Sequence, residues 1–273
     1  MQKKETIDWL FVMPNDLIGG GAQQVLYTII NFLIKQGKSC TVVFTVKKKH
    51  RGWESIENKC NIVYLENSSV YKGYFDAFKY IKKLTKRHHI KHAISSQTLI
   101  NGLLGFLKFV KTLKNTKLIL RESTSIFLRF KGFKLLLYKT AYKFGYKQAD
   151  LMICQTDLMR EQLLEALPWL KKKNKVVVIP NPVNLDEITT KASESIYFEI
   201  DNYIVTAGRI IPEKGFDLLI DSFNLLIDKS LKLVILGMGT NKEKQKLVNQ
   251  IETLGLQNRV ILYGFAKNVY PIF

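Results

Sequence analysis

Residues 202–223 read NYIVTAGRIIPEKGFDLLIDSF, and they combine a strand, a loop and the start of a helix. The run Tyr203–Val205 is apolar and β-branched, as in a buried strand, and apolar residues follow Gly215 at helical spacing. The loop between them carries Arg209 and Lys214. Backbone N–H groups at a helix start together with two cations favour an anionic ligand such as phosphate. The alternative is a βα turn whose cations are only solvated.

The same residues resemble a known segment. GRIIPEKGFDLLIDSF is similar to the GR…EKG segment that opens the donor-binding domain of family 4 glycosyltransferases, which are retaining enzymes of the GT-B fold. The resemblance implies that Arg209 and Lys214 contact the diphosphate of a nucleotide-sugar and that Gly208 lies in the same cleft loop. It also implies that no metal and no cofactor are required.

Length and composition set the broad class. At 273 residues with 47% hydrophobic residues, the chain has room for two domains with cores. Its three cysteines contain no CxxC pair, so neither a disulfide framework nor a zinc site is expected. The apolar runs are too short for a signal peptide or a membrane span, which predicts a cytoplasmic protein.

The positive charge is concentrated in the first part of the chain. Residues 1–180 hold 32 Lys and Arg against 12 Asp and Glu, a net +20, whereas residues 181–273 hold 10 against 11, a net −1. This asymmetry predicts a polyanionic partner for the first part, either an anionic membrane leaflet or nucleic acid. Residues 126–148 mix aromatic and basic residues and are the predicted membrane contact. Single-stranded nucleic-acid binding and a core helix with a solvated lysine face are the alternatives for this stretch.

The chain opens as a βαβ unit. A strand over Ile7–Met13, a helix over residues 22–34 capped by Gly37, and a strand over Cys40–Val46 predict a parallel sheet. GGGAQQVLYTI resembles the glycine-rich GGxE loop of family 4, which implies that Gly20 and Gly21 lie at the cleft near the donor phosphates and the acceptor. Gln23 stands near the position that Glu often holds in the family.

A second strand of this part runs into polar residues. The segment Leu118–Ser123 ends in Arg121 and Glu122, and the carboxyl end of a parallel strand faces the ligand cleft. LRESTS resembles a family segment that carries Arg-Glu-Asn or a cleft His. No His is present here, so no catalytic residue is assigned. Arg121 and Glu122 are predicted either to contact substrate or to form a structural ion pair.

Three histidines precede another strand. His88, His89 and His92 lack the HExxH spacing and lie among Lys and Arg, so a metal site is not expected. They are predicted to form a loop that leads into the strand Ala93–Ser95.

The remaining motifs set the domain boundaries. IPNPVN resembles the family segment that closes the first domain, so we expect an acceptor-binding domain over 1–180, a linker over 181–201 and a donor domain over 202–273. Gly237 and Gly239 follow a strand and are expected to let nucleotide or phosphate approach. The family's paired-Glu helix does not follow Phe265. The predicted fold is therefore α/β, with two Rossmann-like domains facing a cleft (GT-B), the second one truncated, and weak or no turnover.

The functional expectation is a retaining hexosyltransferase of polysaccharide biosynthesis. It would move a sugar from an NDP-sugar to a lipid-linked or other saccharide acceptor, as a peripheral protein on the inner membrane face. The alternative is a non-catalytic remnant that binds a membrane or a partner protein. Nucleic acid is not expected as the partner, because no RRM, KH or zinc-knuckle pattern is present. A nicotinamide dehydrogenase is disfavoured because GxGxxG is missing.

Overall fold

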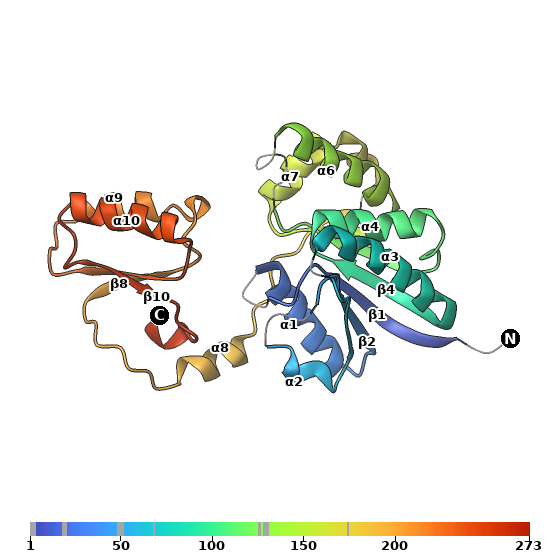
Figure 1. Ribbon diagram of the computed structural model, residues 1–273, viewed down its shortest axis with the longest axis horizontal. Coiled ribbons are helices and arrows are strands. Elements are labelled where there is room, and N and C mark those ends of the chain that lie inside the picture. The colour runs from blue at the N-terminus through green and yellow to red at the C-terminus, as the bar shows by residue number, and fades with distance from the viewer. Residues whose placement is uncertain are drawn as a thin grey trace. The chain divides into compact units, whose positions relative to one another are not determined.

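The computed structural model contains two compact units, Met1–Val183 and Asn184–Phe273 (Figure 1). It describes residues 4–17, 21–47, 52–67, 69–124, 127, 131–173 and 175–273.

The first unit is built on a seven-stranded parallel sheet with the order β3-β2-β1-β4-β5-β6-β7. The central strand β1 is almost entirely apolar from Leu10 to Met13, because helices cover both of its faces. The parallel sheet predicted from the opening βαβ pattern is confirmed. The strands are β1 (Glu5–Met13), β2 (Cys40–Phe44), β3 (Asn61–Tyr64), β4 (His88–Ser95), β5 (Lys117–Arg121), β6 (Leu151–Cys154) and β7 (Val176–Val178).

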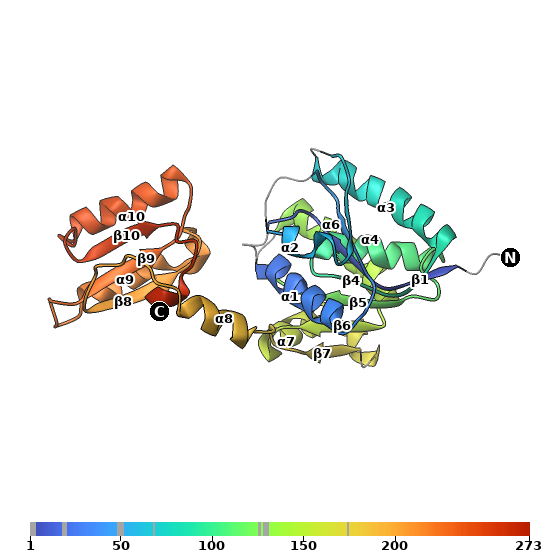
Figure 2. The same cartoon turned by 90° about the horizontal axis from the view of Figure 1, so that it is seen from below.

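Two layers of helices cover this sheet (Figures 1 and 2). The strand order reverses at β1, so right-handed crossovers place the helices before and after that point on opposite faces. One face packs α1 (Gly21–Lys35) and α2 (Glu54–Glu57) around Phe11 and Trp53. The other face packs α3 (Val70–Arg87), α4 (Thr98–Phe109), α6 (Gly132–Gly145) and α7 (Asp157–Ala166), with short 3-10 turns η1 (Tyr146–Gln148) and η2 (Pro168–Lys173).

Helices α4 and α6 approach each other backbone to backbone. A Cβ atom placed on Gly105 would lie 2.0 Å from the carbonyl oxygen of Gly145, and one on Gly102 would lie 2.9 Å from the Cβ of Ala141. These distances leave no room for a larger residue. The small residues therefore set the spacing between the two helices.

The second unit is a three-stranded parallel sheet with the order β10-β9-β8. Helices α9 (Phe216–Asn224) and α10 (Asn241–Thr253) cover one face through Ile220 and Leu247 (Figure 1). The turn η4 (Tyr270–Ile272) packs Ile272 against Val234 on the other face. The strands are β8 (Tyr203–Ala207), β9 (Lys232–Leu236) and β10 (Val260–Gly264).

Two sequence predictions need correction. The three histidines lie inside β4 and not in a loop, because β1 extends to Glu5 and pairs with β4 from His88 onward. His92 then stacks on Trp9, with the ring centroids 4.4 Å apart. Pairing with the first residues of β1 thus extends β4 to His88, although the apolar residues of β4 alone indicated a strand only from Ala93.

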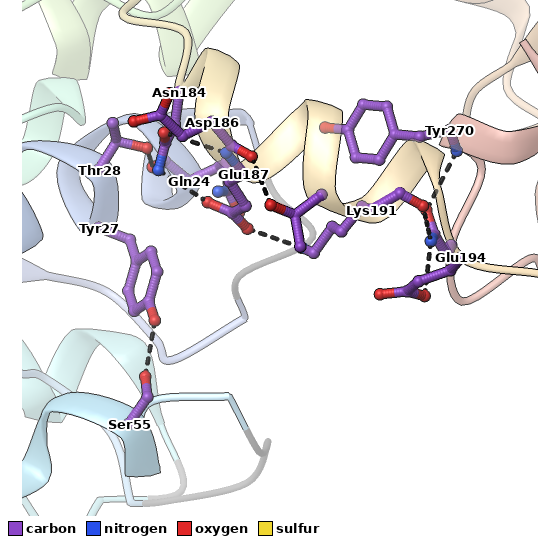
Figure 3. Close-up of polar contacts among 12 residues, drawn as sticks. Gln24, Tyr27, Thr28, Ser55, Asn184, Asp186, Glu187, Lys191, Glu194 and Tyr270 are labelled. Carbon is purple, nitrogen blue, oxygen red and sulfur yellow. Dashed lines mark hydrogen bonds and ion pairs between the residues drawn. The ribbon is translucent and has the colours of Figure 1, made fainter.

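Part of the predicted linker is a helix, α8 (Leu185–Ala192). Asn184 caps its start by accepting from the backbone N–H of Glu187 at 3.3 Å, and Lys191 forms a 2.7 Å ion pair with Glu187 (Figure 3). The helix buries none of its residues, and its apolar positions are few: Leu185, Ile188 and Ala192. Caps and an i,i+4 ion pair stabilise it locally.

In the part of the chain that the structure describes, no helix is both long enough and apolar enough to span a bilayer.

We predict that Gly105→Ala destabilises the first unit. The added methyl group must push α6 away from α4, which costs roughly 1–3 kcal/mol of unfolding free energy, as overpacking does in other cores. Urea unfolding followed by circular dichroism measures the change. Gly21→Ala is the control, because a Cβ there meets nothing within 4 Å. Equal stability of the two variants would show that α4 and α6 do not need this close contact.

Candidate functional site

The loop between β8 and α9 carries two exposed cations. Arg209 and Lys214 are both exposed, and no described residue makes a hydrogen bond or an ion pair with either side chain. The methylene chain of Lys214 runs past Gly208, since a Cβ there would lie 3.5 Å from its Cε. Both charged groups are thus available to a ligand.

The start of α9 adds free backbone N–H groups beside these cations, and its first turn also carries the carboxylate of Asp217. Gly215 has the left-handed conformation (φ 63°) and precedes the first turn of the helix without a side-chain cap. The free N–H groups of a first turn carry the positive end of the helix dipole. Lys214 is the residue directly before this cap. The sequence prediction of a loop, two cations and a helix start is confirmed as local structure, and its ligand stays a prediction.

The glycines after β8 and β9 hold these loops against each other. A Cβ on Gly237 would lie 1.8 Å from the carbonyl oxygen of Gly208, and one on Gly239 would lie 2.4 Å from that of Ile210. The ladder continues past the strands, because Ile210 donates its N–H to Met238 at 2.8 Å. The space that a side chain on Gly237 or Gly239 would need is therefore filled by the chain's own backbone. This packing is one physical reason for glycine at both positions, and the approach of nucleotide or phosphate to them stays a prediction.

A groove of about 230 Å³ lies behind the loop, against α10. Its walls include the carboxylates Asp217 and Glu243, whereas neither Arg209 nor Lys214 lines it. Lys246 also lines the groove, but it lies 3.9 Å from Glu243, so two carboxylates face one cation that is already paired. This balance of charge favours the exposed loop over the groove as the place for an anion.

In the first unit, Arg121 and Glu122 are buried at the carboxyl end of β5. Arg121 donates to Ser96 Oγ at 2.5 Å and to Asn181 Oδ1. Burial lowers the pKa of Arg121. The ion pair considered from the sequence is not what holds these side chains, because Arg121 and Glu122 bind different partners.

Glu122 is enclosed by two tyrosines of the α6 region. The hydroxyls of Tyr142 and Tyr146 each donate to one of its carboxylate oxygens at 2.5 Å. Burial raises the pKa of Glu122, although these hydrogen bonds act in the opposite direction. Because the carboxyl group is enclosed and both of its oxygens have partners, its position is that of a structural residue.

The glycine-rich loop before α1 is described only in part. Gly20 lies outside the described residues, and Gly21 is the first residue of α1, with open space where a side chain would be. Gln23 is buried and donates to Asn15 Oδ1 at 3.0 Å. The first turn of α1 contains no acidic residue.

The sequence analysis did not single out several polar residues at the carboxyl end of the first unit's sheet. Asn181 receives a hydrogen bond from Arg121, and its amide donates to Gln155 at 3.3 Å, while Gln155 donates to the Glu122 carbonyl at 3.2 Å. Ser96, Gln155 and Asn181 each follow shortly after the end of a strand. That position, where a parallel sheet gathers its ligand-facing loops, is the signal that could have found them.

Comparison with protein families decides the identity. The family model described as Glycosyltransferase Family 4 matches residues 19–187, which is more than half of the chain. The chain belongs to glycosyltransferase family 4. A second model, described as Glycosyl transferases group 1, matches residues 188–272. The resemblance read from the sequence motifs is thereby confirmed.

Curated relatives of this glycosyltransferase match it over part of their length. An uncharacterized glycosyltransferase of Methanocaldococcus jannaschii is 31% identical over 211 residues, which is 74% of this chain and 51% of that protein. The N-acetylgalactosamine-N,N'-diacetylbacillosaminyl-diphospho-undecaprenol 4-alpha-N-acetylgalactosaminyltransferase of Campylobacter jejuni is 32% identical over 157 residues, 57% of this chain and 41% of that one. The chain thus spans about half, or less, of the length of these two relatives.

Solved structures establish the fold as GT-B. The Anabaena HepE structure with UDP and glucose superposes with a TM-score of 0.73 at 15% identity, covering 97% of this chain and 71% of that one. The lipopolysaccharide outer core galactosyltransferase WaaB superposes with a TM-score of 0.68 at 18% identity, covering 97% and 70%. The predicted fold class, two Rossmann-like α/β domains, is confirmed.

We predict that Glu122→Gln changes how stability depends on pH. A carboxyl group whose pKa is raised on folding contributes stability that is full below its ordinary value, near 4.5, and is lost as the pH rises through the folded value. The glutamine variant lacks this loss, so its unfolding free energy relative to the parent should rise from pH 5 to pH 8. Urea unfolding at several pH values measures the difference.

Glu161→Gln is the matched control, because Glu161 is an exposed carboxylate on α7 of the same unit. It removes one negative charge without touching the buried site. If the difference in unfolding free energy between Glu122→Gln and the parent does not change with pH, the result would contradict a raised pKa for a buried Glu122 carboxyl group.

Proposed function

We propose that this chain forms the acceptor-binding domain and part of the donor-binding domain of a retaining hexosyltransferase. The donor is a nucleoside-diphosphate sugar, and the acceptor is a lipid-linked or other saccharide used in surface-glycan assembly. The observation that carries the proposal is the pair Arg209 and Lys214, exposed beside the free start of α9 without a partner among the described residues.

In this proposal the two cations act on the leaving group. As the bond between the anomeric carbon and the diphosphate oxygen breaks, negative charge grows on the diphosphate. A guanidinium and an ammonium held beside it, with the N–H groups of a helix start, stabilise that charge more in the transition state than in the ground state. The packing around Gly208 and Gly237 holds the backbone that carries these groups in place before the donor binds.

Two of the compared proteins support the choice of substrates. The HepE structure contains UDP and glucose, which fits a nucleotide-sugar donor. The Campylobacter jejuni relative is named for a diphospho-undecaprenol acceptor, which fits a lipid-linked one. The net +20 charge of residues 1–180 suits an acceptor held at an anionic membrane surface, and we place the protein on the cytoplasmic face of the inner membrane.

We predict that Lys214→Ala and Arg209→Ala each weaken the binding of UDP or GDP. Losing one charge-assisted hydrogen bond to phosphate costs roughly 1.5–3 kcal/mol, which is about 10- to 100-fold in Kd. Isothermal titration calorimetry at fixed ionic strength measures the binding of each nucleotide.

Lys244→Ala is the matched control, because Lys244 is an exposed lysine of α10 in the same unit. It should leave the affinity unchanged. Equal affinities of the parent and Lys214→Ala would remove Lys214 from the donor site. A parent chain that binds neither nucleotide would favour a non-catalytic membrane- or partner-binding role instead.

A further inference from the structure

Helices α3, α4 and α6 lie side by side on one face of the first unit (Figures 1 and 2). Large apolar side chains point from them into solvent: Tyr71, Phe75, Phe106, Phe109, Val110, Phe133 and Leu136, between 41% and 81% exposed. We call this surface the α3–α4–α6 face. Leaving so many aromatic rings in water is unfavourable, which indicates that another phase or molecule covers them.

The apolar side chains are not scattered singly. The ring centroids of Phe78 on α3 and Phe106 on α4 lie 6.1 Å apart, and those of Phe106 and Phe109 lie 6.4 Å apart. On α3, the ammonium of Lys79 lies 4.2 Å above the ring of Phe75. Aromatic and cationic groups therefore alternate within one surface.

The charge of this region has nearly one sign. Residues 58–149 contain 19 Lys and Arg but only three acidic residues, Glu66, Asp76 and Glu122. Asp76 accepts a 2.8 Å hydrogen bond from Asn67, and Glu122 is buried. The exposed cations of the three helices and the turn after α4 include Lys72, Lys79, Lys82, Lys83, Lys86, Arg87, Lys111, Lys114, Lys139 and Lys143.

This combination fits a lipid surface better than a protein partner. The cores of protein interfaces are depleted in lysine, whereas helices that lie on membranes place Phe and Leu at the acyl boundary with lysines among the headgroups. Anionic lipids attract each nearby lysine. We propose that the α3–α4–α6 face binds an anionic bilayer, with its Phe side chains at the boundary between headgroups and acyl chains.

The structure changes the membrane contact expected from the sequence. Of the stretch 126–148, α6 supplies exposed Phe133 and Leu136, but Tyr142 and Tyr146 are buried in the core. More of the apolar surface comes from α3 and α4, which the sequence did not single out. The biological role of this membrane contact rests on the proposed function: a first unit bound to the bilayer can receive a lipid-linked acceptor at the bilayer surface.

The test is vesicle binding by the 1–273 chain without any sugar donor. Co-sedimentation with vesicles of phosphatidylglycerol and phosphatidylcholine (1:1) should show binding that weakens at 0.5 M NaCl, and vesicles of phosphatidylcholine alone should bind far less. Lys79→Gln/Lys82→Gln/Lys83→Gln should weaken binding on the order of a hundredfold, about fivefold for each lysine. Phe75→Ser/Phe109→Ser should weaken it at least tenfold.

Matched controls come from the second unit. Lys242→Gln/Lys244→Gln/Lys267→Gln removes three exposed lysines there, and Leu225→Ser/Ile227→Ser removes two side chains that are 82% and 94% exposed. Both should bind vesicles like the parent. Circular dichroism and urea unfolding like those of the parent show that the first-unit variants are folded. Unchanged UDP binding, which the second unit would carry, separates this test from that of the donor site.

Three results would overturn the proposal. One is equal binding to both kinds of vesicle, and another is equal loss of binding in the variants of the two units. The third is tighter binding to single-stranded RNA than to anionic vesicles at equal salt, with no effect of Phe75→Ser/Phe109→Ser. UDP binding that persists in any of these cases leaves the donor proposal standing.

Discussion

Two loops of the second unit lie backbone against backbone, and the position of Arg209 and Lys214 depends on that contact. Gly208 donates its N–H to Leu236 at 2.9 Å, while the space for a side chain on Gly237 is taken by the Gly208 carbonyl. Gly237 also has φ 155°, a backbone conformation that glycine adopts most readily. A side chain at Gly237 would therefore move the loop that carries both cations. The backbone of the loop that carries both cations is therefore positioned by its contact with Gly237.

The two units use their polar residues in opposite ways. At the edge of the first unit, Arg121 and Glu122 are buried, and Ser96, Asn181 and two tyrosines satisfy their hydrogen bonds. Buried charges need such partners, so these groups stabilise the edge and the start of the linker. In the second unit, Arg209 and Lys214 are exposed and have no described partner. Free charges of this kind are available for binding, which is why the donor proposal rests on the second unit.

The fold could be predicted from the sequence because its signals are local. Apolar runs such as Ile7–Met13 and Tyr203–Val205 indicated strands in both sheets, and the structure has β1 and β8 there. Features that depend on residues far away in the sequence could not be predicted from local patterns. The histidines of β4 belong to a strand because β1 pairs with them, and α8 forms without a buried face. The burial of Arg121 and Glu122 likewise depends on residues up to 60 positions away.

The most direct test of the central claim is a crystal structure of the chain with UDP. We expect diphosphate oxygens within hydrogen-bonding distance of Arg209, Lys214 and the first backbone N–H groups of α9. The loops around Gly208 and Gly237 should keep their backbone positions, because they are already packed against each other. A diphosphate bound elsewhere, with Arg209 and Lys214 still solvated, would contradict the claim that this loop is the donor phosphate site.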